Sequence, residues 1–230
     1  MKKIRLNRKI ISQIFWHNLL LDFRCKQERW RKELESEIDE NSNFVRPQIL
    51  ATTGTLTINE AAVLYSAVKY FDVKTIVEIG TFIGTSTTAM AKAVTDNGFK
   101  DGRLWTCDYA NDVRLKCSYN IDLKYFGQRS STDMLRTIDQ AIDFFFIDGT
   151  LRSEDIDHIA RLSTENSILL LDDFEGLEKG VRNAFSLEKN FADHLVIYPM
   201  SEAQATELGY PGACKFCFLL PRNTLALTRQ

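Results

Sequence analysis

The run from Thr75 to Ser86 constrains the fold of this chain more than any other segment. A mostly apolar stretch, 75–79, leads directly into two glycines at a Gly-x-x-x-Gly spacing, Gly80 and Gly84, and a helix-like run follows. A strand, a tight turn and a helix start in this order are typical of an α/β sheet where it binds the anionic end of a nucleotide-like ligand. Glycine at both positions allows a sharp turn and lets a ligand approach a backbone without a Cβ atom.

The acidic residue Glu78 narrows the class of ligand. It stands two residues before the first glycine, which would put its carboxylate at the strand tip, facing the crevice. There it would repel a pyrophosphate, and the spacing also lacks the Gly-x-Gly-x-x-Gly of dinucleotide sites. S-adenosylmethionine (SAM) carries ribose hydroxyls, a sulfonium and an ammonium, so it fits better than NAD. We expect the turn to bind SAM through Glu78, Gly80, Thr81, Gly84 and Thr85.

Composition indicates a soluble globular protein. Hydrophobic residues make up 44% and charged residues 26% of the 230 residues, which suits one domain with an appendage. A net charge of -2 gives no general attraction to nucleic acid or anionic membranes. We find no signal peptide or membrane span, and we expect a cytoplasmic protein with reduced cysteines. Cys214 and Cys217 would point to opposite faces of a strand, which favours buried thiols over a zinc or redox pair.

The N-terminal region differs from the rest of the chain. Basic residues crowd its first part, acidic ones follow, and apolar residues recur at helical spacing, among them Ile10, Ile14, Phe15 and Leu19. We expect a helical extension over residues 1–45 that packs on the main domain, 46–230, or on a second subunit. A homodimer through these helices is the arrangement we favour, and a membrane-surface or nucleic-acid-binding helix is the alternative.

From residue 73 the pattern alternates between strand and helix. We expect strands at 74–79, 103–107, 126–130, 143–148, 167–172, 193–198 and 213–220, and helices at 85–95, 112–120, 133–139, 153–162 and 177–188. A capping box at Thr57–Glu60 opens an earlier helix that runs to about Tyr70. The alternation predicts an α/β fold with a mainly parallel sheet and helices on both faces. The last two strands are joined by what reads as a loop, 199–212, so they should pair antiparallel.

Polar residues follow the second and third expected strands. Asp108 ends the strand after the glycine turn, where it could accept hydrogen bonds from a ribose diol; capping a helix is the alternative. After the third strand, Thr132 and Asp133 could contact the adenine edge. Asp133 could equally be the N-cap of the short helix that follows.

Three carboxylates follow the fourth and fifth expected strands. Asp148 ends one buried apolar run, and Asp172 and Asp173 end the next. The carboxyl ends of adjacent parallel strands meet at one edge, so these side chains should converge and repel each other unless protonated or bound to a cation. Oxygen ligands favour Mg²⁺ or Ca²⁺, which could activate a substrate hydroxyl. The alternative is an ion pair with Arg152, Lys179 or Arg182 and a helix cap.

Residues 54–188 resemble the class I SAM-dependent methyltransferases. The narrower resemblance is to the branch with the catechol, caffeoyl-CoA and macrocin O-methyltransferases, carried by the segments 77–86, 145–149, 171–174 and 180–182. It implies a Rossmann-like, mainly parallel seven-stranded sheet with an antiparallel last strand. It also implies Mg²⁺ on Asp148, Asp172 and Asp173, and methyl transfer to oxygen.

One position departs from this branch, whose members commonly carry a His or Lys base three residues beyond the first metal-binding Asp. Here that position is Leu151. Asp148 and Arg152 are therefore the expected catalytic residues, with Arg152 orienting the substrate. Metal-independent transfer to nitrogen or oxygen, and SAM binding without catalysis by a protein that acts through its N-terminal helices, are the alternatives.

For the acceptor, a small molecule, we expect a sugar-like diol rather than a catechol. Two neighbouring oxygens that chelate the expected metal gain more than a lone hydroxyl. The expected mouth of the site is polar, with Ser201, Glu202, Gln204, Thr206 and Glu207, which favours the sugar.

Overall fold

The structure, a computed structural model, describes residues 10–20, 32, 56–109, 119–175, 177, 179–210 and 214–222. The expected helix at 112–120 lies almost entirely outside the described residues. Most of the N-terminal extension and the segment 50–55 lie outside them as well.

Seven strands form one sheet in the order β3-β2-β1-β4-β5-β7-β6. Their bounds are β1 Thr75–Ile79, β2 Arg103–Asp108, β3 Asp122–Gly127, β4 Ile142–Ile147, β5 Ser163–Leu171, β6 His194–Ile197 and β7 Cys217–Pro221. The first five are parallel, and β7 lies between β5 and β6 and runs antiparallel to both. The predicted mainly parallel sheet with an antiparallel last strand is confirmed.

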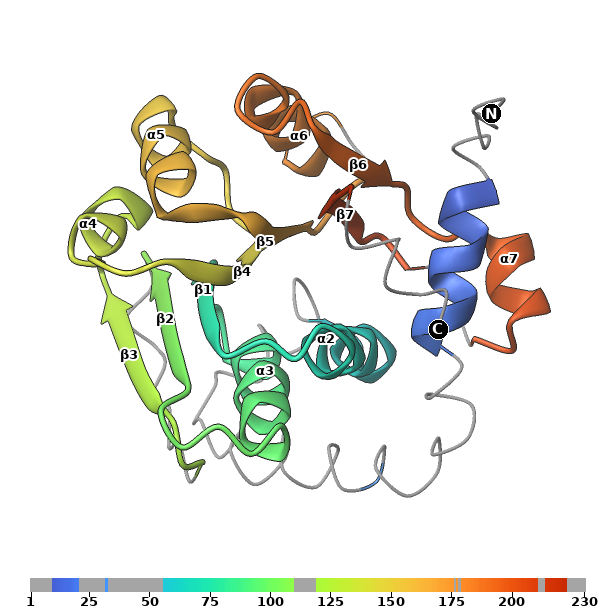
Figure 1. Ribbon diagram of the computed structural model, residues 1–230, viewed down its shortest axis with the longest axis horizontal. Coiled ribbons are helices and arrows are strands. Elements are labelled where there is room, and N and C mark those ends of the chain that lie inside the picture. The colour runs from blue at the N-terminus through green and yellow to red at the C-terminus, as the bar shows by residue number, and fades with distance from the viewer. Residues whose placement is uncertain are drawn as a thin grey trace, which may run out of the picture.

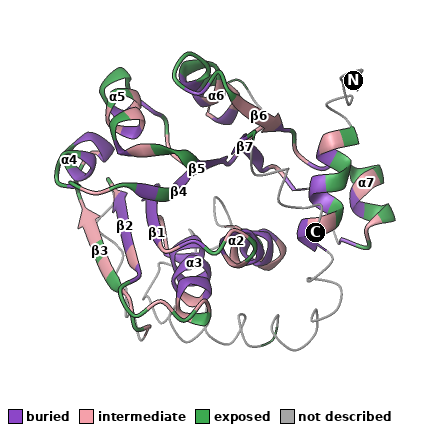
Figure 2. Ribbon diagram, in the orientation of Figure 1, coloured by how far each residue is buried: buried purple, intermediate pink, exposed green. Residues whose placement is uncertain are grey.

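The strands β1 and β7 are buried throughout, and most of β4 and the second half of β5 are buried as well (Figure 2). This explains their nearly continuous apolar sequences, which are typical of parallel strands covered by helices on both sides. In β4, for example, Phe144, Phe145 and Phe146 are all completely buried.

Helices cover the sheet in two layers (Figure 1). One face carries α2 (Ile58–Tyr70) and α3 (Thr85–Asp96), and the other carries α4 (Ser131–Arg136), α5 (Ser153–Leu162) and α6 (Gly180–Glu188). Each layer encloses its own apolar cluster. The capping box predicted for α2 is present, with Thr57 and Glu60 bonding each other's backbone.

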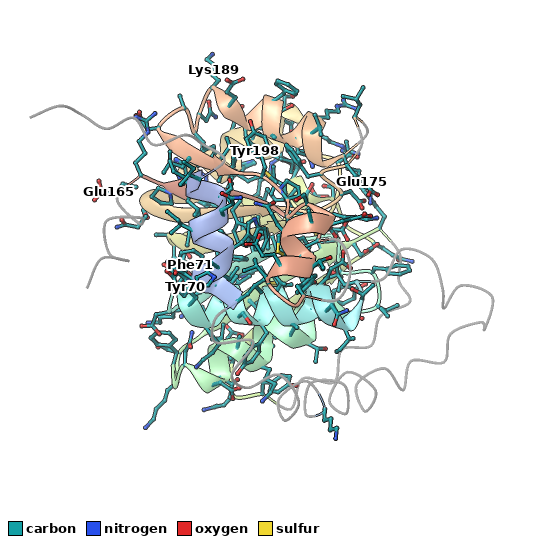
Figure 3. All side chains as sticks on the ribbon, turned by 90° about the vertical axis from the view of Figure 1, so that its right-hand side faces the viewer. Tyr70, Phe71, Glu165, Glu175, Lys189 and Tyr198 are labelled. Carbon is teal, nitrogen blue, oxygen red and sulfur yellow. The ribbon has the colours of Figure 1, made fainter. Side chains whose placement is uncertain are left out.

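A helix over residues 10–20 packs into the same core as α2, α3 and β7. Trp16 is completely buried, lies edge-on to Phe218 and donates from Nε1 to the carbonyl of Tyr198 at 2.9 Å. Figure 3 shows this helix beside α7 (Glu202–Glu207), with Tyr198 near one end and Phe71 near the other. The described part of the extension thus packs on its own domain.

The expected apolar stripe of this helix is only partly covered. Phe15 and Leu19 are buried, whereas Ile10 and Ile14 stay exposed. The helix therefore presents one face to the core, and two of the four residues expected to be buried lie on its outer side.

Two expectations from the sequence were wrong in detail. The segment 199–212 is not only a loop, because it contains α7, whose N-terminus is capped by Ser201 and Gln204. These two residues therefore bond the helix end instead of forming a polar mouth. The third strand lies earlier than expected, at Asp122–Gly127, because as an edge strand with alternating exposure it has a weak apolar pattern.

The described cysteines, Cys107, Cys214 and Cys217, are free and buried, as expected. Cys214 belongs to one apolar cluster and Cys217 to the other, so the two thiols lie on opposite faces of the sheet. Burial raises the pKa of each thiol, which keeps them protonated and unreactive.

Candidate active site

The sheet register brings the expected site residues to one edge. Ile79 pairs with Cys107 on one side and with Ile147 on the other, and Ile147 pairs with Leu171. The next residue in each strand or loop is Gly80, Asp108, Asp148 or Asp172. They meet at the carboxyl edge beside the point where the strand order reverses, the usual ligand site of an open α/β sheet.

The glycine turn is held in an unusual backbone conformation. Gly80, Phe82 and Gly84 all have positive φ, at 104°, 46° and 83°. The backbone N–H groups of Gly80 and Thr81 both donate to the carbonyl of Cys107 at 3.1 Å, and the N–H of Phe82 donates to Asp108 Oδ2 at 2.6 Å. The end of β2 therefore fixes the shape of the turn.

The missing side chain of Gly80 serves a contact within the protein. A Cβ atom at Gly80 would lie 3.1 Å from the carbonyl carbon and oxygen of Asp148. Packing inside the protein is therefore a second reason for glycine here, beside the expected approach of a ligand. Glycine lets the ends of β1 and β4 approach each other, so that Asp148 lies directly against the turn.

Glu78 is placed differently from the open strand-tip position that the sequence suggested. Its side chain is completely buried, on the α3 side of the sheet, and accepts hydrogen bonds from the hydroxyls of Ser86, Thr87 and Thr106. The reason is strand alternation, which points Glu78 to the same face as Ile76. Burial raises its pKa to about 7, against the opposing effect of the three hydroxyls.

Asp108 and Arg152 border the same edge. Asp108 is half-buried at the tip of β2, where it holds the turn through Phe82. Arg152 precedes α5, is exposed, and donates from Nη2 to the hydroxyl of Tyr109 at 2.8 Å, with its guanidinium 5.9 Å from the centre of that ring. Arg152 and Tyr109 thus connect the β4–α5 loop to the tip of β2.

Thr132 and Asp133 do not open onto a crevice together as expected. Thr132 is buried, and its hydroxyl donates to Asp155 at 2.6 Å. Asp133 is exposed and pairs with Ser130, which is the N-cap of α4 in place of Asp133. Asp155 also accepts from Ser131 and from the backbone of Arg152, so it joins α4 to the start of α5.

The three carboxylates predicted from the sequence converge, and two of them pair with a lysine. Lys179 Nζ lies 2.9 Å from Asp173 Oδ2 and 3.4 Å from Asp148 Oδ1. Asp172 is buried next to them, and its Oδ1 accepts from the backbone N–H of Asp173 at 2.7 Å. Asp173 itself has a positive φ of 52°. Sequence reasoning named Lys179 as one of three alternative ion-pair partners.

Burial first, and crowding of negative charge second, shift the pKa values in this cluster. Burial, opposed by Lys179 and supported by Asp173, raises the pKa of Asp148 to about 6. Burial and the charge of Asp148 raise the pKa of Asp172 to about 8. For Lys179, burial works against the charged form, but the hydrogen bond to Asp173 and the charge of Asp148 outweigh it and raise the pKa.

Two residues that sequence reasoning missed position this cluster. Asn183, on α6, is buried and bridges the backbone of the β4–α5 loop: it accepts from Leu151 N at 3.1 Å and donates to Gly149 O at 2.8 Å. A Cβ atom at Gly180 would overlap the carbonyl of Asp172 and lie 2.8 Å from Phe174 N. The Gly180–Arg182 segment was noted only as part of a resemblance.

Leu151 occupies the position where the sequence resemblance led us to look for a base. Its side chain is buried in the apolar cluster under α5 and α6, so it supplies no acid or base. His158, on α5, is half-buried. His194 bonds the carbonyl of Ser167 in the middle of β5.

The predicted Mg²⁺ site does not fit the cluster as it stands. The ammonium of Lys179 already lies between Asp148 and Asp173. Within the part of the chain that the structure describes, no group of three or more His, Cys, Asp or Glu side chains is arranged to hold a metal ion.

Two pockets lie at opposite edges of the sheet. A small crevice beside the glycine turn is lined by Leu56, Gly80, Thr81, Phe82, Ile83, Thr85, Ser86 and Asp148. A much larger cavity of about 590 Å³ lies at the opposite edge, near Glu165 and Lys189. In Figure 3, Glu165 lies on one side and Glu175, which follows the carboxylate cluster, on the other. We assign the site to the small crevice because the turn and the charged groups meet there.

Residues 77–174 match the family model described as a methyltransferase domain. The chain carries a methyltransferase domain. The matched segment runs from β1 through the glycine turn to Asp172 and Asp173, so it contains the whole edge just described. Together with the fold, this confirms the prediction of a class I SAM-dependent methyltransferase. No curated protein sequence matches the chain significantly.

Solved structures share the fold of this methyltransferase. The O-methyltransferase TomG from Streptomyces achromogenes, in complex with SAM, has a TM-score of 0.53 and 18% identity, with 82% of this chain and 88% of that chain covered. The SAH-bound methyltransferase PaMTH1 from Podospora anserina gives 0.52 and 14%, with 96% and 99% covered. The O-methyltransferase from Bacillus cereus, in complex with SAH, gives 0.52 and 16%, with 81% and 90% covered.

None of the helices in the described ranges combines the length and the apolar character needed to cross a bilayer.

Proposed function

We propose that this methyltransferase transfers a methyl group from SAM to a hydroxyl of a small molecule that carries two neighbouring hydroxyls. The observation that carries the proposal is the position of Asp148. Its backbone lies against Gly80 of the cofactor turn, and its carboxylate belongs to the cluster with Lys179. The cofactor turn and a charged acceptor site therefore meet at one residue.

On the cofactor side, the chain offers groups that match the parts of SAM. The N-terminus of α3, which begins at Thr85 after Gly84, presents backbone N–H groups suited to a carboxylate. Asp108, at the tip of β2, suits the ribose diol. Thr81, Thr85 and Asp148 line the crevice between them. Glu78 acts by fixing this turn through its three hydroxyl partners.

On the acceptor side, Asp148 is the candidate group to receive the proton of the reacting hydroxyl. With a pKa raised to about 6, it is more basic than an ordinary carboxylate and is still largely ionised at neutral pH. Bound SAM supplies an electrophilic methyl group. The turn and the acidic cluster must hold the two reactants about 3–3.5 Å apart for transfer. Arg152, held by Tyr109, would orient the acceptor.

Several finer points belong to the proposal. Carboxylates and an ammonium recognise neighbouring hydroxyls through several hydrogen bonds, and both sugar diols and catechols offer them. A sugar-like diol is the acceptor we propose, and a catechol is the alternative. TomG and the Bacillus cereus protein are O-methyltransferases, which supports oxygen as the acceptor atom. The free, buried thiols support a cytoplasmic location. Mg²⁺ on Asp148, Asp172 and Asp173 is the alternative source of positive charge, and it requires Lys179 to move away.

The cofactor assignment is tested by calorimetry with SAM on matched variants. Asp108→Asn should weaken SAM binding by about tenfold or more, because the amide replaces a charged acceptor for the ribose hydroxyls. Asp133→Asn, an exposed aspartate on α4, should change binding by less than about twofold. Equal effects of the two variants, or no effect of Asp108→Asn, would remove Asp108 from the cofactor site.

The acceptor class is tested with a panel of catechols and sugar diols incubated with SAM. We expect methylated products among the sugar diols. Turnover of simple catechols alone would overturn the preference for sugars and leave the methyl transfer itself intact.

A further inference from the structure

We propose that the ammonium of Lys179 is the resident cation of the acceptor site, so that this enzyme needs no divalent metal for methyl transfer. The inference rests on the proposed function, because it concerns how the same site neutralises its carboxylates. It differs from the metal-dependent expectation that the sequence raised for Asp148, Asp172 and Asp173.

The first step is the position of the charge. Lys179 Nζ is within 2.9 Å of an oxygen of Asp173 and 3.4 Å of an oxygen of Asp148, so it joins the two carboxylates that follow different strands. Bringing together carboxylates from β4 and β5 costs free energy unless a positive group lies between them. Lys179 is the positive group that the described cluster contains.

The second step is exclusion of a divalent ion. Mg²⁺ binds oxygen at about 2.1 Å, so an ion held by Asp148 and Asp173 would lie only a few ångströms from the ammonium. Two cations at about 4 Å in a partly buried site repel each other by several kcal/mol even at an effective dielectric of about 20. One oxygen of Asp172 also already accepts the backbone N–H of Asp173. The ammonium and the metal are therefore alternatives.

The third step is that contacts of α6 with the two carboxylate-bearing loops fix the position of Lys179. Lys179 is the N-cap residue of α6. The helix can begin there because Gly180, which has no side chain, packs on the backbone of residues 172–174. One turn later Asn183 ties the helix to Gly149 and Leu151, directly after Asp148. Both carboxylate-bearing loops are thus fixed to the first turn of the helix that carries the lysine.

The fourth step is what the ammonium can do chemically. A lysine has three N–H donors, and the two carboxylates take one each, so one donor remains to hold an oxygen of the acceptor. The side chain is 43% exposed, which leaves it reachable from solvent. Lys179 would then keep Asp148 ionised and aligned while it contacts the substrate, two tasks that a metal performs in a metal-dependent site.

The test compares Mn²⁺ binding and methyl transfer in wild type, Lys179→Ala and Lys179→Arg. Wild type should show no saturable Mn²⁺ binding by calorimetry and should keep its turnover in EDTA. Lys179→Ala should transfer methyl about 100-fold more slowly, with SAM affinity changed by less than about threefold. The emptied cluster should now bind Mn²⁺, and added Mn²⁺ should restore part of the turnover. Lys179→Arg should retain most of the activity without metal.

The matched control is Lys189→Ala, an exposed lysine at the far end of α6, which should behave like wild type in both measurements. One Mn²⁺ bound per wild-type chain, or loss of wild-type turnover in EDTA, would overturn the inference. Full turnover of Lys179→Ala without metal would overturn it as well.

Failure of the proposed function gives a different result. Wild type would then bind no SAM, or would bind SAM and form no S-adenosylhomocysteine with any acceptor, whatever the Mn²⁺ titrations show. The wild-type Mn²⁺ titration needs no folded variant and no known acceptor, so it decides the question of the resident cation by itself.

Discussion

Among single residues, Glu78 connects three elements of the cofactor side. Its carboxylate on β1 accepts from Ser86 and Thr87 at the start of α3 and from Thr106 on β2. Thr106 also bonds Thr81 of the turn, hydroxyl to hydroxyl, at 2.5 Å. Two acids therefore hold the glycine turn: the buried Glu78 acts through Thr106, and Asp108 bonds the turn directly.

The buried Glu78 predicts a pH dependence of stability. Its pKa is raised from 4.5 to about 7 in the folded state, chiefly by burial. The folded state therefore keeps the proton that the unfolded chain releases first. The stabilising contribution is complete below about pH 4.5 and is lost as the pH rises through about 7.

Glu78→Gln removes this titration, which denaturant unfolding at several pH values can measure. Between about pH 4.5 and pH 8, the unfolding free energy of wild type minus that of Glu78→Gln should fall by about 3 kcal/mol. A difference that stays constant, or that rises with pH, would contradict the account.

The sequence could predict which residues reach the site edge but not what each side chain does there. Asp108, Asp148, Asp172 and Asp173 all follow apolar strands, and the sheet register brings them to one edge. Strand alternation sets the face to which Glu78 points. The hydroxyls that surround Glu78 and the acid that binds Thr132 belong to neighbouring elements, which no local pattern encodes. The choice of Lys179 over Arg152 or Arg182 depends on where α6 begins.

At the scale of elements, α6 acts as the support of the acceptor site. Its first turn carries Lys179 and Gly180 against the end of β5, and Asn183 against the loop after β4. The helix therefore sets the distance between Asp148 and Asp173, although it contributes no carboxylate of its own to the cluster.

Asn183→Ala tests this support. The substitution leaves the buried N–H of Leu151 and the carbonyl of Gly149 without their partner, which should cost about 2–4 kcal/mol of unfolding free energy. Methyl transfer should fall more than SAM affinity, because the change lies on the acceptor side. Ser186→Ala, an exposed residue of the same helix, should cost less than about 0.5 kcal/mol in the same denaturant measurement. Similar costs for the two variants would count against the bridging role.

The helix over residues 10–20 is part of the main core, and substitutions of Trp16 measure how much it stabilises the fold. Trp16→Ala should lower the unfolding free energy by about 3–5 kcal/mol, because a large buried side chain leaves a cavity beside Phe218. Trp16→Phe should cost about 1–2 kcal/mol, mainly through the lost hydrogen bond to Tyr198. The exposed Ile14→Ala on the same helix is the control, with less than about 0.5 kcal/mol expected. If Trp16→Ala unfolded at the same urea concentration as wild type, the helix would contribute nothing to the unfolding free energy.

The elements themselves were predictable to different degrees. The strands β1, β2 and β4 and the helix α5 follow strong apolar periodicity and begin and end within about two residues of the expected positions. The helix α7 was missed because it has only six residues and a single buried one, which is too short for an apolar repeat. Its Ser201 and Gln204 do form a capping box, which signals a helix start. The edge strand β3 is half-exposed, so its pattern competes with that of a loop.

At the scale of the whole molecule, the predicted homodimer concerns a surface that the domain leaves open. Phe15 and Leu19 are used inside the chain, while Ile10 and Ile14 stay exposed on the outer side of the same helix. A dimer through the N-terminal helices should therefore use Ile10 and Ile14.

Light scattering at a protein concentration on the order of 10 µM should give the mass of a dimer. Ile14→Asp should give the mass of a monomer without loss of fold, because this side chain is not part of the core. Phe185→Asp, which changes a still more exposed apolar residue on α6, should leave the dimer intact. A monomeric wild type, or dissociation by Phe185→Asp alone, would contradict an interface through these helices.

The proposed function therefore combines a methyltransferase sheet with a glycine turn for the cofactor and a charged cluster for the acceptor, which meet at Asp148. The measurement that tests this most directly is incubation of the wild-type enzyme with methyl-labelled SAM and a panel of small molecules with vicinal hydroxyls, followed by mass spectrometry of the products. The account predicts one labelled methyl group on an oxygen of an acceptor for each molecule of S-adenosylhomocysteine formed. Tight SAM binding with no S-adenosylhomocysteine formed from any acceptor, or methyl transfer only to nitrogen, would contradict it.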